Sequence, residues 1–221
     1  MNNYLLTLNR EDKCIDIVFD KSINSKIKVI EDEHAFMFID GYFANAEEFI
    51  KKNSSLESVE IGELLFKLSK INFDYHGELD GSFNIIFFDK KKNYFVYTND
   101  FWSSRPTYIH KTRNKYLFSN DLCYLKKYIK CELTPNLKKI KELLAWQQIG
   151  SRSTYYNEID KLGPGIVLKI TSNEINETSL NIIDSRKKFT KYDKKNFKKI
   201  FESAVSNRAS HFKKVMLMLS G

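Results

Sequence analysis

The sequence predicts an α+β fold in which two antiparallel sheets are covered by helices, followed by the start of an α/β unit. Apolar strand patterns come in consecutive pairs separated by short polar turns, which is typical of antiparallel hairpins. The helical patterns stand between blocks of strands and do not alternate with them one by one. Residues 193–221 differ, because a helix pattern there leads into a continuous apolar strand, as in a parallel sheet.

The N-terminal region predicts three strands and a short helix. Residues 3–8 (NYLLTL), 15–20 (IDIVFD) and 34–41 (HAFMFIDG) carry strand patterns, and Asp40-Gly41 is expected to close the third. Asn45 is expected to cap a helix through Lys52, because Glu48 can complete a capping box. A longer helix is predicted from Ser58, with a stripe suited to cover a sheet: Ile61, Leu64, Leu65, Leu68 and Ile71.

The densest strand signal is a pair of hairpins between residues 81 and 119. The first joins 81–89 to 94–100 across KKKN, and the second joins 106–110 to 115–119 across KTRN. An aromatic cluster accompanies the first hairpin, and such rings could stack on nucleic-acid bases. Period-two spacing favours burial in a core instead, for the following residues: Phe87, Phe88, Tyr94, Phe95, Tyr97, Phe101 and Trp102.

One more helix and two strands complete the first domain. Thr134 is expected to cap the helix, with Pro135 at its first position and Gly150 as its left-handed stop. Its apolar face is predicted to consist of Leu137, Ile140, Leu143 and Leu144. Strands are predicted at 163–170 (GPGIVLKI) and 179–184 (SLNIID).

A change in composition divides the chain. Residues 1–184 form the predicted first domain, the basic stretch 185–192 is the predicted linker, and 193–221 begin a second domain. Asp193 is expected to cap the helix of that second domain. The apolar stripe of this helix is Phe197, Ile200, Phe201, Ala204, Val205 and Phe212.

Composition, residue spacing and net charge argue against several classes of function. No stretch approaches the roughly 18 apolar residues of a membrane span, and the three unevenly spaced cysteines and the lack of a signal peptide favour the cytoplasm. Four scattered histidines without zinc-type spacing argue against a metal site. The net charge of +8 comes from small lysine groups with acids nearby, so solvated faces are favoured over nucleic-acid binding.

Four segments together resemble the asparagine-synthetase family. They are residues 79–109 (LDGSFNIIFFDKKKNYFVYTNDFWSSRPTYI), 116–125 (YLFSNDLCYL), 133–170 (from LTPNLKK to GPGIVLKI) and 216–221 (MLMLSG). The resemblance implies an N-terminal class II glutamine amidotransferase domain with an N-terminal-nucleophile hydrolase-like sandwich. It also implies a C-terminal ATP-pyrophosphatase domain, which joins an acid to an amine through an acyl-adenylate and uses ATP and Mg.

The chain departs from that family at the residues that carry glutaminase chemistry. Asn2 stands where the family has its nucleophilic cysteine, and an amide cannot replace a thiolate. Asp40-Gly41-Tyr42 replaces Asn-Gly-Glu, and the residues that hold glutamine's α-amino and carboxylate groups are not found. The resemblance therefore implies a degenerate glutamine pocket at Asn2, Asp40 and Gly41, with no catalytic residue. Asp80-Gly81 is kept, but a turn suffices to explain it.

The phosphate loop that the resemblance implies is incomplete. Leu219, Ser220 and Gly221 match the first residues of Ser-Gly-Gly-x-Asp-Ser, whose backbone N–H groups would grip ATP phosphates. ATP use is thus expected only of a complete protein or with a second polypeptide that supplies the missing sheet. The predicted function is the N-terminal part of an asparagine-synthetase-like, ATP-dependent amide-forming ligase with a non-catalytic first domain, acting on a small-molecule or peptide carboxylate. The alternatives are a stand-alone pseudo-glutaminase binding or regulatory module and a β-lactam- or lasso-peptide macrolactam-forming relative.

Overall fold

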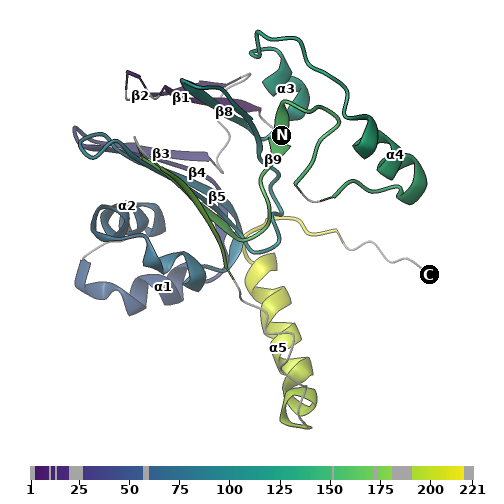
Figure 1. The fold of residues 1–221 in the computed structure, drawn as a ribbon. Coiled ribbons are helices and arrows are strands. Elements are labelled where there is room, and N and C mark those ends of the chain that lie inside the picture. The colour runs from purple at the N-terminus through teal and green to yellow at the C-terminus, as the bar shows by residue number, and fades with distance from the viewer. Residues whose placement is uncertain are drawn as a thin grey trace.

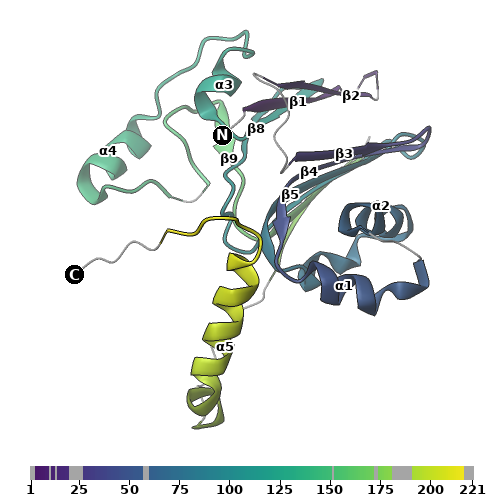
Figure 2. The same cartoon turned by 180° about the vertical axis from the view of Figure 1, so that it is seen from behind.

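The structure is a computed structural model that describes residues 3–9, 11–12, 14–19, 27–56, 60–150, 152–171, 174–180 and 191–216. Within these residues, two antiparallel sheets pack face to face (Figures 1 and 2). The five-stranded sheet has the order β2-β1-β8-β7-β9: Cys14–Phe19, Tyr4–Asn9, Lys115–Ser119, Tyr108–Lys111 and Ile159–Lys161. The six-stranded sheet has the order β11-β10-β6-β5-β4-β3: Ile175–Ser179, Ile166–Ile170, Tyr94–Asn99, Gly81–Asp89, Ala35–Phe43 and Ile27–Glu31.

Helices lie outside both sheets. Helices α1 (Ala46–Lys52) and α2 (Ile61–Ile71) cover the six-stranded sheet, and the short α3 (Leu122–Lys126) lies outside the five-stranded sheet (Figure 1). Helix α4 (Leu137–Trp146) lies to one side, and α5 (Lys191–Ala209) projects from the end of the sandwich (Figure 2). Two short 3₁₀ helices, Ser54–Leu56 and Asp74–Glu78, flank α2. The predicted α+β class, with antiparallel sheets between helices, is confirmed.

Burial of both faces of β4 explains why the sequence of this strand is continuously apolar. Phe36 and Phe38 face the core between the two sheets, whereas Met37 and Ile39 face the core under α1 and α2. A strand buried on both faces cannot alternate apolar and polar residues. A third, smaller core joins α3 to the outer face of the five-stranded sheet through Leu5, Tyr124, Leu125 and Ile159.

The two predicted hairpins form, but in different sheets. Strands β5 and β6 belong to the six-stranded sheet, and β7 and β8 pair beside β1 in the other. Four members of the aromatic cluster, Phe87, Phe88, Phe95 and Tyr97, are buried as predicted. Tyr94 and Phe101 are partly buried, and Trp102 is 74% exposed. Strands β3 and β9 escaped prediction because each is short and partly polar. The strand predicted at 179–184 lies mostly outside the described residues, and β11 ends at Ser179.

Three predicted helix boundaries are wrong. Helix α4 is capped by Asn136, whose side chain accepts from the Lys139 N–H, so Pro135 lies outside the helix. The helix ends where Gln147 itself takes the left-handed conformation, and Gly150 is not its stop. Helix α5 begins at Lys191, which places Asp193 inside the helix.

The apolar stripes of α4 and α5 are largely uncovered. Leu137 and Leu144 on α4, and Phe197, Ile200 and Phe201 on α5, are all exposed. Residues 214–216 form no strand, and Val215 and Met216 are exposed; the rest of the predicted terminal strand lies outside the described residues. No helix in the described ranges combines the length and the apolarity needed to cross a membrane.

Candidate functional site

Asp40 lies near the end of β4 and is held in a buried ion pair. Its Oδ1 accepts a hydrogen bond from Arg105 Nη1 at 2.7 Å, and both side chains are almost completely buried. The prediction that Asp40-Gly41 closes the strand is wrong, because pairing with β5 continues through Phe43, opposite Gly81. Asp40 is therefore an interior residue of the sandwich and not a turn residue.

The turn after β6 positions Arg105. The Asp100 carboxylate accepts from the Ser104 hydroxyl at 2.8 Å and from the backbone N–H groups of Trp102, Ser104 and Phe83. These bonds fold residues 100–104 back against β5. Arg105 then emerges beside Ser82, whose carbonyl accepts from its Nε at 3.2 Å.

Gly41 is required by the close approach of β4 and β5. Its φ is +137°, and an added Cβ would lie 2.0 Å from the Ser82 carbonyl oxygen. Gly81, with φ +154°, has the matching relationship to the Tyr42 carbonyl oxygen. Only glycine avoids the clash and the strained conformation. This pair of glycines keeps Asp40 next to the chain segment that carries Arg105.

Buried polar groups continue from Asp40 into the space between the sheets. Burial, reinforced by the negative charge of Asp40, raises the pKa of the Tyr4 hydroxyl above its ordinary value. Tyr97 donates to Asn84 Oδ1 at 3.0 Å, and burial raises its pKa as well. Within the described residues, Tyr4 Oη, Asn84 Nδ2 and Thr107 Oγ1 form no hydrogen bond of ordinary geometry, although Asn84 and Thr107 lie close enough to the Tyr4 hydroxyl to oppose the rise in its pKa. The start of β1 thus lies against the polar interior around Asp40.

Tyr42, which follows Asp40-Gly41, contacts the end of α5. Its ring lies 5.1 Å from that of His211 and 5.3 Å, edge on, from that of Phe212. Nearby, Arg208 Nη2 donates to Asp80 Oδ1 at 2.7 Å. These contacts attach the last turn of α5 to the sandwich, while the rest of the helix projects (Figure 1).

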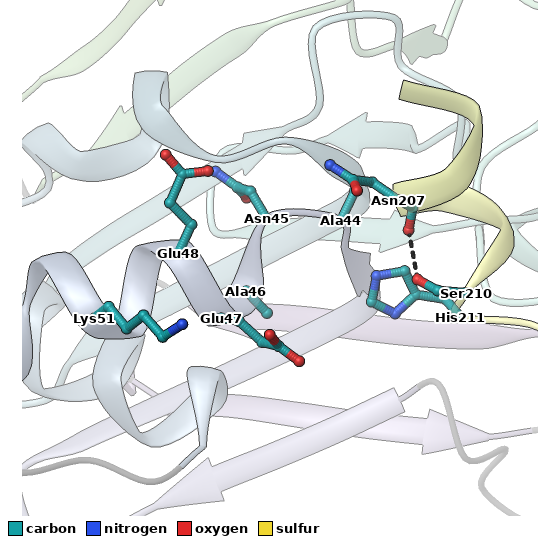
Figure 3. Close-up of a pocket in the computed structure, with 9 residues that line it drawn as sticks. All are labelled: Ala44, Asn45, Ala46, Glu47, Glu48, Lys51, Asn207, Ser210 and His211. Carbon is teal, nitrogen blue, oxygen red and sulfur yellow. Dashed lines mark hydrogen bonds between the residues drawn. The ribbon is translucent and has the colours of Figure 1, made fainter. Parts of the chain in front are cut away.

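A polar pocket of about 390 Å³ opens at this junction (Figure 3). One wall comes from α1 and the residues before it, and the other from Asn207, Ser210 and His211. Asn45 lies in this wall, but its side chain does not cap α1 as predicted. Its Nδ2 donates to the Glu78 carbonyl and its Oδ1 accepts from the Asp80 N–H, so the amide braces the 78–80 turn instead.

The structure locates only part of the predicted site. Asp40 and Gly41 adjoin each other beside Arg105, whereas Asn2, Leu219, Ser220 and Gly221 lie outside the described residues. The sequence patterns gave no indication that Arg105 pairs with Asp40. The signal that could have found this pair is an aspartate in an otherwise apolar strand, which needs a buried counter-ion.

The cysteines lie away from Asp40. Cys14 pairs with Asn9 at the far end of β1 from Tyr4, and Cys123 is exposed on α3, outside the five-stranded sheet. Cys131 is also exposed and lines a groove on that same outer face. Groups of His, Cys, Asp or Glu suitable for a metal ion are absent from the residues that the structure describes.

A sequence profile described as a glutamine amidotransferase domain matches residues 42–181, well over half of the chain. The chain belongs to the glutamine amidotransferase domain family. The matched residues begin after Asp40 and Gly41. They include every strand of the glutamine amidotransferase domain from β5 to β11, but not the Asp40-Gly41 pair. No curated protein matches the sequence significantly.

Two solved structures are similar to this glutamine amidotransferase domain at low identity. One is an allosteric regulatory enzyme of purine biosynthesis, with 9% identity, a TM-score of 0.49, and coverage of 84% of this chain and 44% of that chain. The other is the glutamine phosphoribosylpyrophosphate amidotransferase of B. subtilis complexed with ADP and GMP, with 9% identity, a TM-score of 0.47, and coverage of 82% and 43%. The chain spans less than half the length of either.

Proposed function

We propose that this glutamine amidotransferase domain is the non-catalytic N-terminal part of an asparagine-synthetase-like ligase. In that enzyme, ATP and Mg would activate a carboxylate as an acyl-adenylate, and an amine would attack it to form an amide. Support comes from the four segments that resemble the family in its own order. The proposed boundaries are 1–184 for the glutaminase-like sandwich, 185–192 for the linker and 193–221 for the beginning of the synthetase domain.

The buried Arg105–Asp40 ion pair is the observation that carries the non-catalytic role. Amide hydrolysis needs hydrogen-bond donors aimed at the oxyanion that develops on the substrate. An ionised carboxylate only accepts hydrogen bonds, so Asp40 cannot supply such a donor, whereas the asparagine of the family can. Arg105 neutralises Asp40 from inside the protein, so the pair requires no substrate to complete it.

The direct test measures glutamate released from glutamine by the purified chain. No release above a buffer blank is expected, both for the natural sequence and for a Cys14→Ser, Cys123→Ser, Cys131→Ser variant. Release that iodoacetamide abolishes in the natural sequence, and that is missing in the triple variant, would contradict the non-catalytic role. A glutaminase-competent class II domain serves as the positive control.

The ligase part of the proposal needs a separate measurement. Its support is the exposed apolar stripe of α5, which would be covered by the remainder of a synthetase domain, in the same chain or in a second polypeptide. ATP–pyrophosphate exchange is expected only when that remainder is present together with a carboxylate such as aspartate. Exchange by residues 1–221 alone would contradict this assignment.

A stand-alone binding or regulatory module is the second candidate, favoured by the exposed Leu144 and Trp146 on α4. The two candidates differ in what α5 does. Introducing a negative charge into the apolar stripe with Phe201→Glu is expected to abolish ligase assembly and to leave a module intact.

A further inference from the structure

A groove of about 520 Å³ crosses the outer face of the five-stranded sheet, on the opposite side from the core between the sheets. Its floor is formed by outward-facing residues of β1, β7 and β8, and its wall by residues 128–131, which follow α3. Leu5, Leu117 and Ile129 belong to the small core under α3. The groove begins where α3 stops covering this sheet, and it leaves that apolar core open.

The charged side chains that line the groove are both lysines, and none of the lining residues is acidic. The lining residues are Leu5, Thr7, His110, Thr112, Lys115, Leu117, Tyr128, Ile129, Lys130 and Cys131. Among the described residues, neither Lys115 nor Lys130 forms an ion pair, although Asp16, which lies opposite Thr7 in the β1–β2 register, brings a carboxylate to the same face of the sheet. A lining with two lysines, an apolar floor and no acidic side chain favours a ligand that brings its own negative charge.

His110 is a fixed part of the lining. It is buried, and its Nδ1 donates to the Glu158 carbonyl at 2.8 Å, since a carbonyl can only accept. Nε2 is therefore the ring nitrogen left to interact with a ligand. The ring is held by the backbone of the segment before β9, so it needs no rearrangement on binding.

We propose that this groove binds a small molecule with an apolar body and one carboxylate head. The apolar body would lie on Leu5 and Leu117, and the carboxylate would lie between the ammonium groups of Lys115 and Lys130. A volume of about 520 Å³ falls in the range of roughly 300–1,000 Å³ that is usual for small-molecule sites. The site is separate from the Arg105–Asp40 pair, which lies between the sheets.

Decanoate is the probe, with decanol as the uncharged analogue of the same chain length. Calorimetric titration of the full chain is expected to show saturable one-to-one binding of decanoate, and binding of decanol at least tenfold weaker. A Lys115→Glu, Lys130→Glu variant is expected to lose at least tenfold in affinity for decanoate. A Lys91→Glu, Lys194→Glu variant carries the same charge change and should bind as the natural sequence does. Lys194 lies on α5, so this control also tests the exposed stripe of α5 as a competing site.

A second readout uses the natural sequence alone. Cys131 lines the groove and Cys123 does not, although both are exposed. Decanoate is expected to slow alkylation of Cys131 at least fivefold, followed by mass spectrometry, and to leave Cys123 unchanged. Unsaturable binding, equal affinity for decanol, an unaffected Lys115→Glu, Lys130→Glu variant, or an unprotected Cys131 would each overturn the proposal.

Discussion

Arg105 Nη1 and Asp40 Oδ1 lie 2.7 Å apart in the interior of the sandwich, although the two residues are 65 positions apart in sequence. Removal of one partner of a buried pair leaves an uncompensated charge, which costs about 3–5 kcal/mol. We therefore expect Arg105→Met to lower the free energy of unfolding by about that amount. Urea unfolding at pH 7 measures it.

The same pair predicts a rescue. In Asp40→Asn, Arg105→Met no buried charge remains, so at least half of the lost stability should return. The exposed pair Arg208–Asp80 provides a contrast, because Arg208→Met should cost no more than about 1 kcal/mol. A double variant as unstable as Arg105→Met would show that the charge of Asp40 is not the cause.

Gly41 predicts a second stability effect. Alanine there would place Cβ 2.0 Å from the Ser82 carbonyl oxygen at a φ of +137°, so Gly41→Ala should cost about 2–5 kcal/mol. Gly77→Ala is the matched control, because its Cβ would meet only Leu180 Cδ2, at 3.8 Å. Thermal unfolding followed by circular dichroism compares the two. Equal costs at both positions would contradict the close approach of β4 and β5.

Asp32 predicts a pH dependence. Hydrogen bonding to Lys70, helped by the His34 and Ala35 N–H groups, lowers the pKa of Asp32 to about 2. The unfolded value is about 3.9, so the ionised carboxylate stabilises the fold above pH 4. That contribution disappears as the pH falls from about 4 to about 2.

The variant Asp32→Asn isolates the charge, because Oδ1 can still accept from the two N–H groups. At pH 7 it should lower the free energy of unfolding by no more than about 1 kcal/mol, since both side chains are about 40% exposed and water screens the pair. The difference from the natural sequence should vanish near pH 2. Urea midpoints at pH 7, 4 and 2 follow it, and a difference that persists at pH 2 would assign the effect to packing.

Tyr42 predicts how firmly α5 is attached. Aromatic contacts of this kind contribute about 0.5–1.5 kcal/mol, so Tyr42→Ala should accelerate hydrogen exchange of the Ser210 and Phe212 amides by about two- to tenfold. These amides donate to Ser206 and Ala209 in the last turn. Tyr155→Ala, which removes an exposed tyrosine elsewhere, should leave them unchanged. Unchanged exchange in Tyr42→Ala would mean that Arg208 and Asp80 alone hold the helix.

Much of the fold could be predicted from periodicity. Strands β1, β4, β5, β6 and β10 are long apolar runs, and burial of the Phe87 and Phe88 side chains on opposite faces of β5 follows directly from their spacing. The missed elements are short: β9 has three residues and is defined only by pairing with β7. The predicted cap at Asn45 also failed because of a contact that is distant in sequence. Asn45 has the right chemistry for a cap, but a turn 33–35 residues later takes up its amide.

The candidate site was harder to predict from the sequence than the fold. The glycine at position 41 and the aspartate at position 40 were recognised by resemblance, but the partner of Asp40 depends on the turn that Asp100 organises. A pairing over 65 positions has no local signal. The groove beside Lys115 and Lys130 was likewise invisible, because its lining comes from three strands and the segment after α3.

The strand order also determines when each sheet can be completed during synthesis. Strand β1 pairs with β8, and β6 pairs with β10, so the chain crosses between the sheets after β2, after β6 and again after β9. One edge of β1 stays open until residues 115–119 leave the ribosome, and β6 waits still longer for residues 166–170. Neither sheet is a separate folding unit, and a nascent chain stalled before Lys115 would carry two unfinished edges, one on β1 and one on β6, each a template for pairing with another chain.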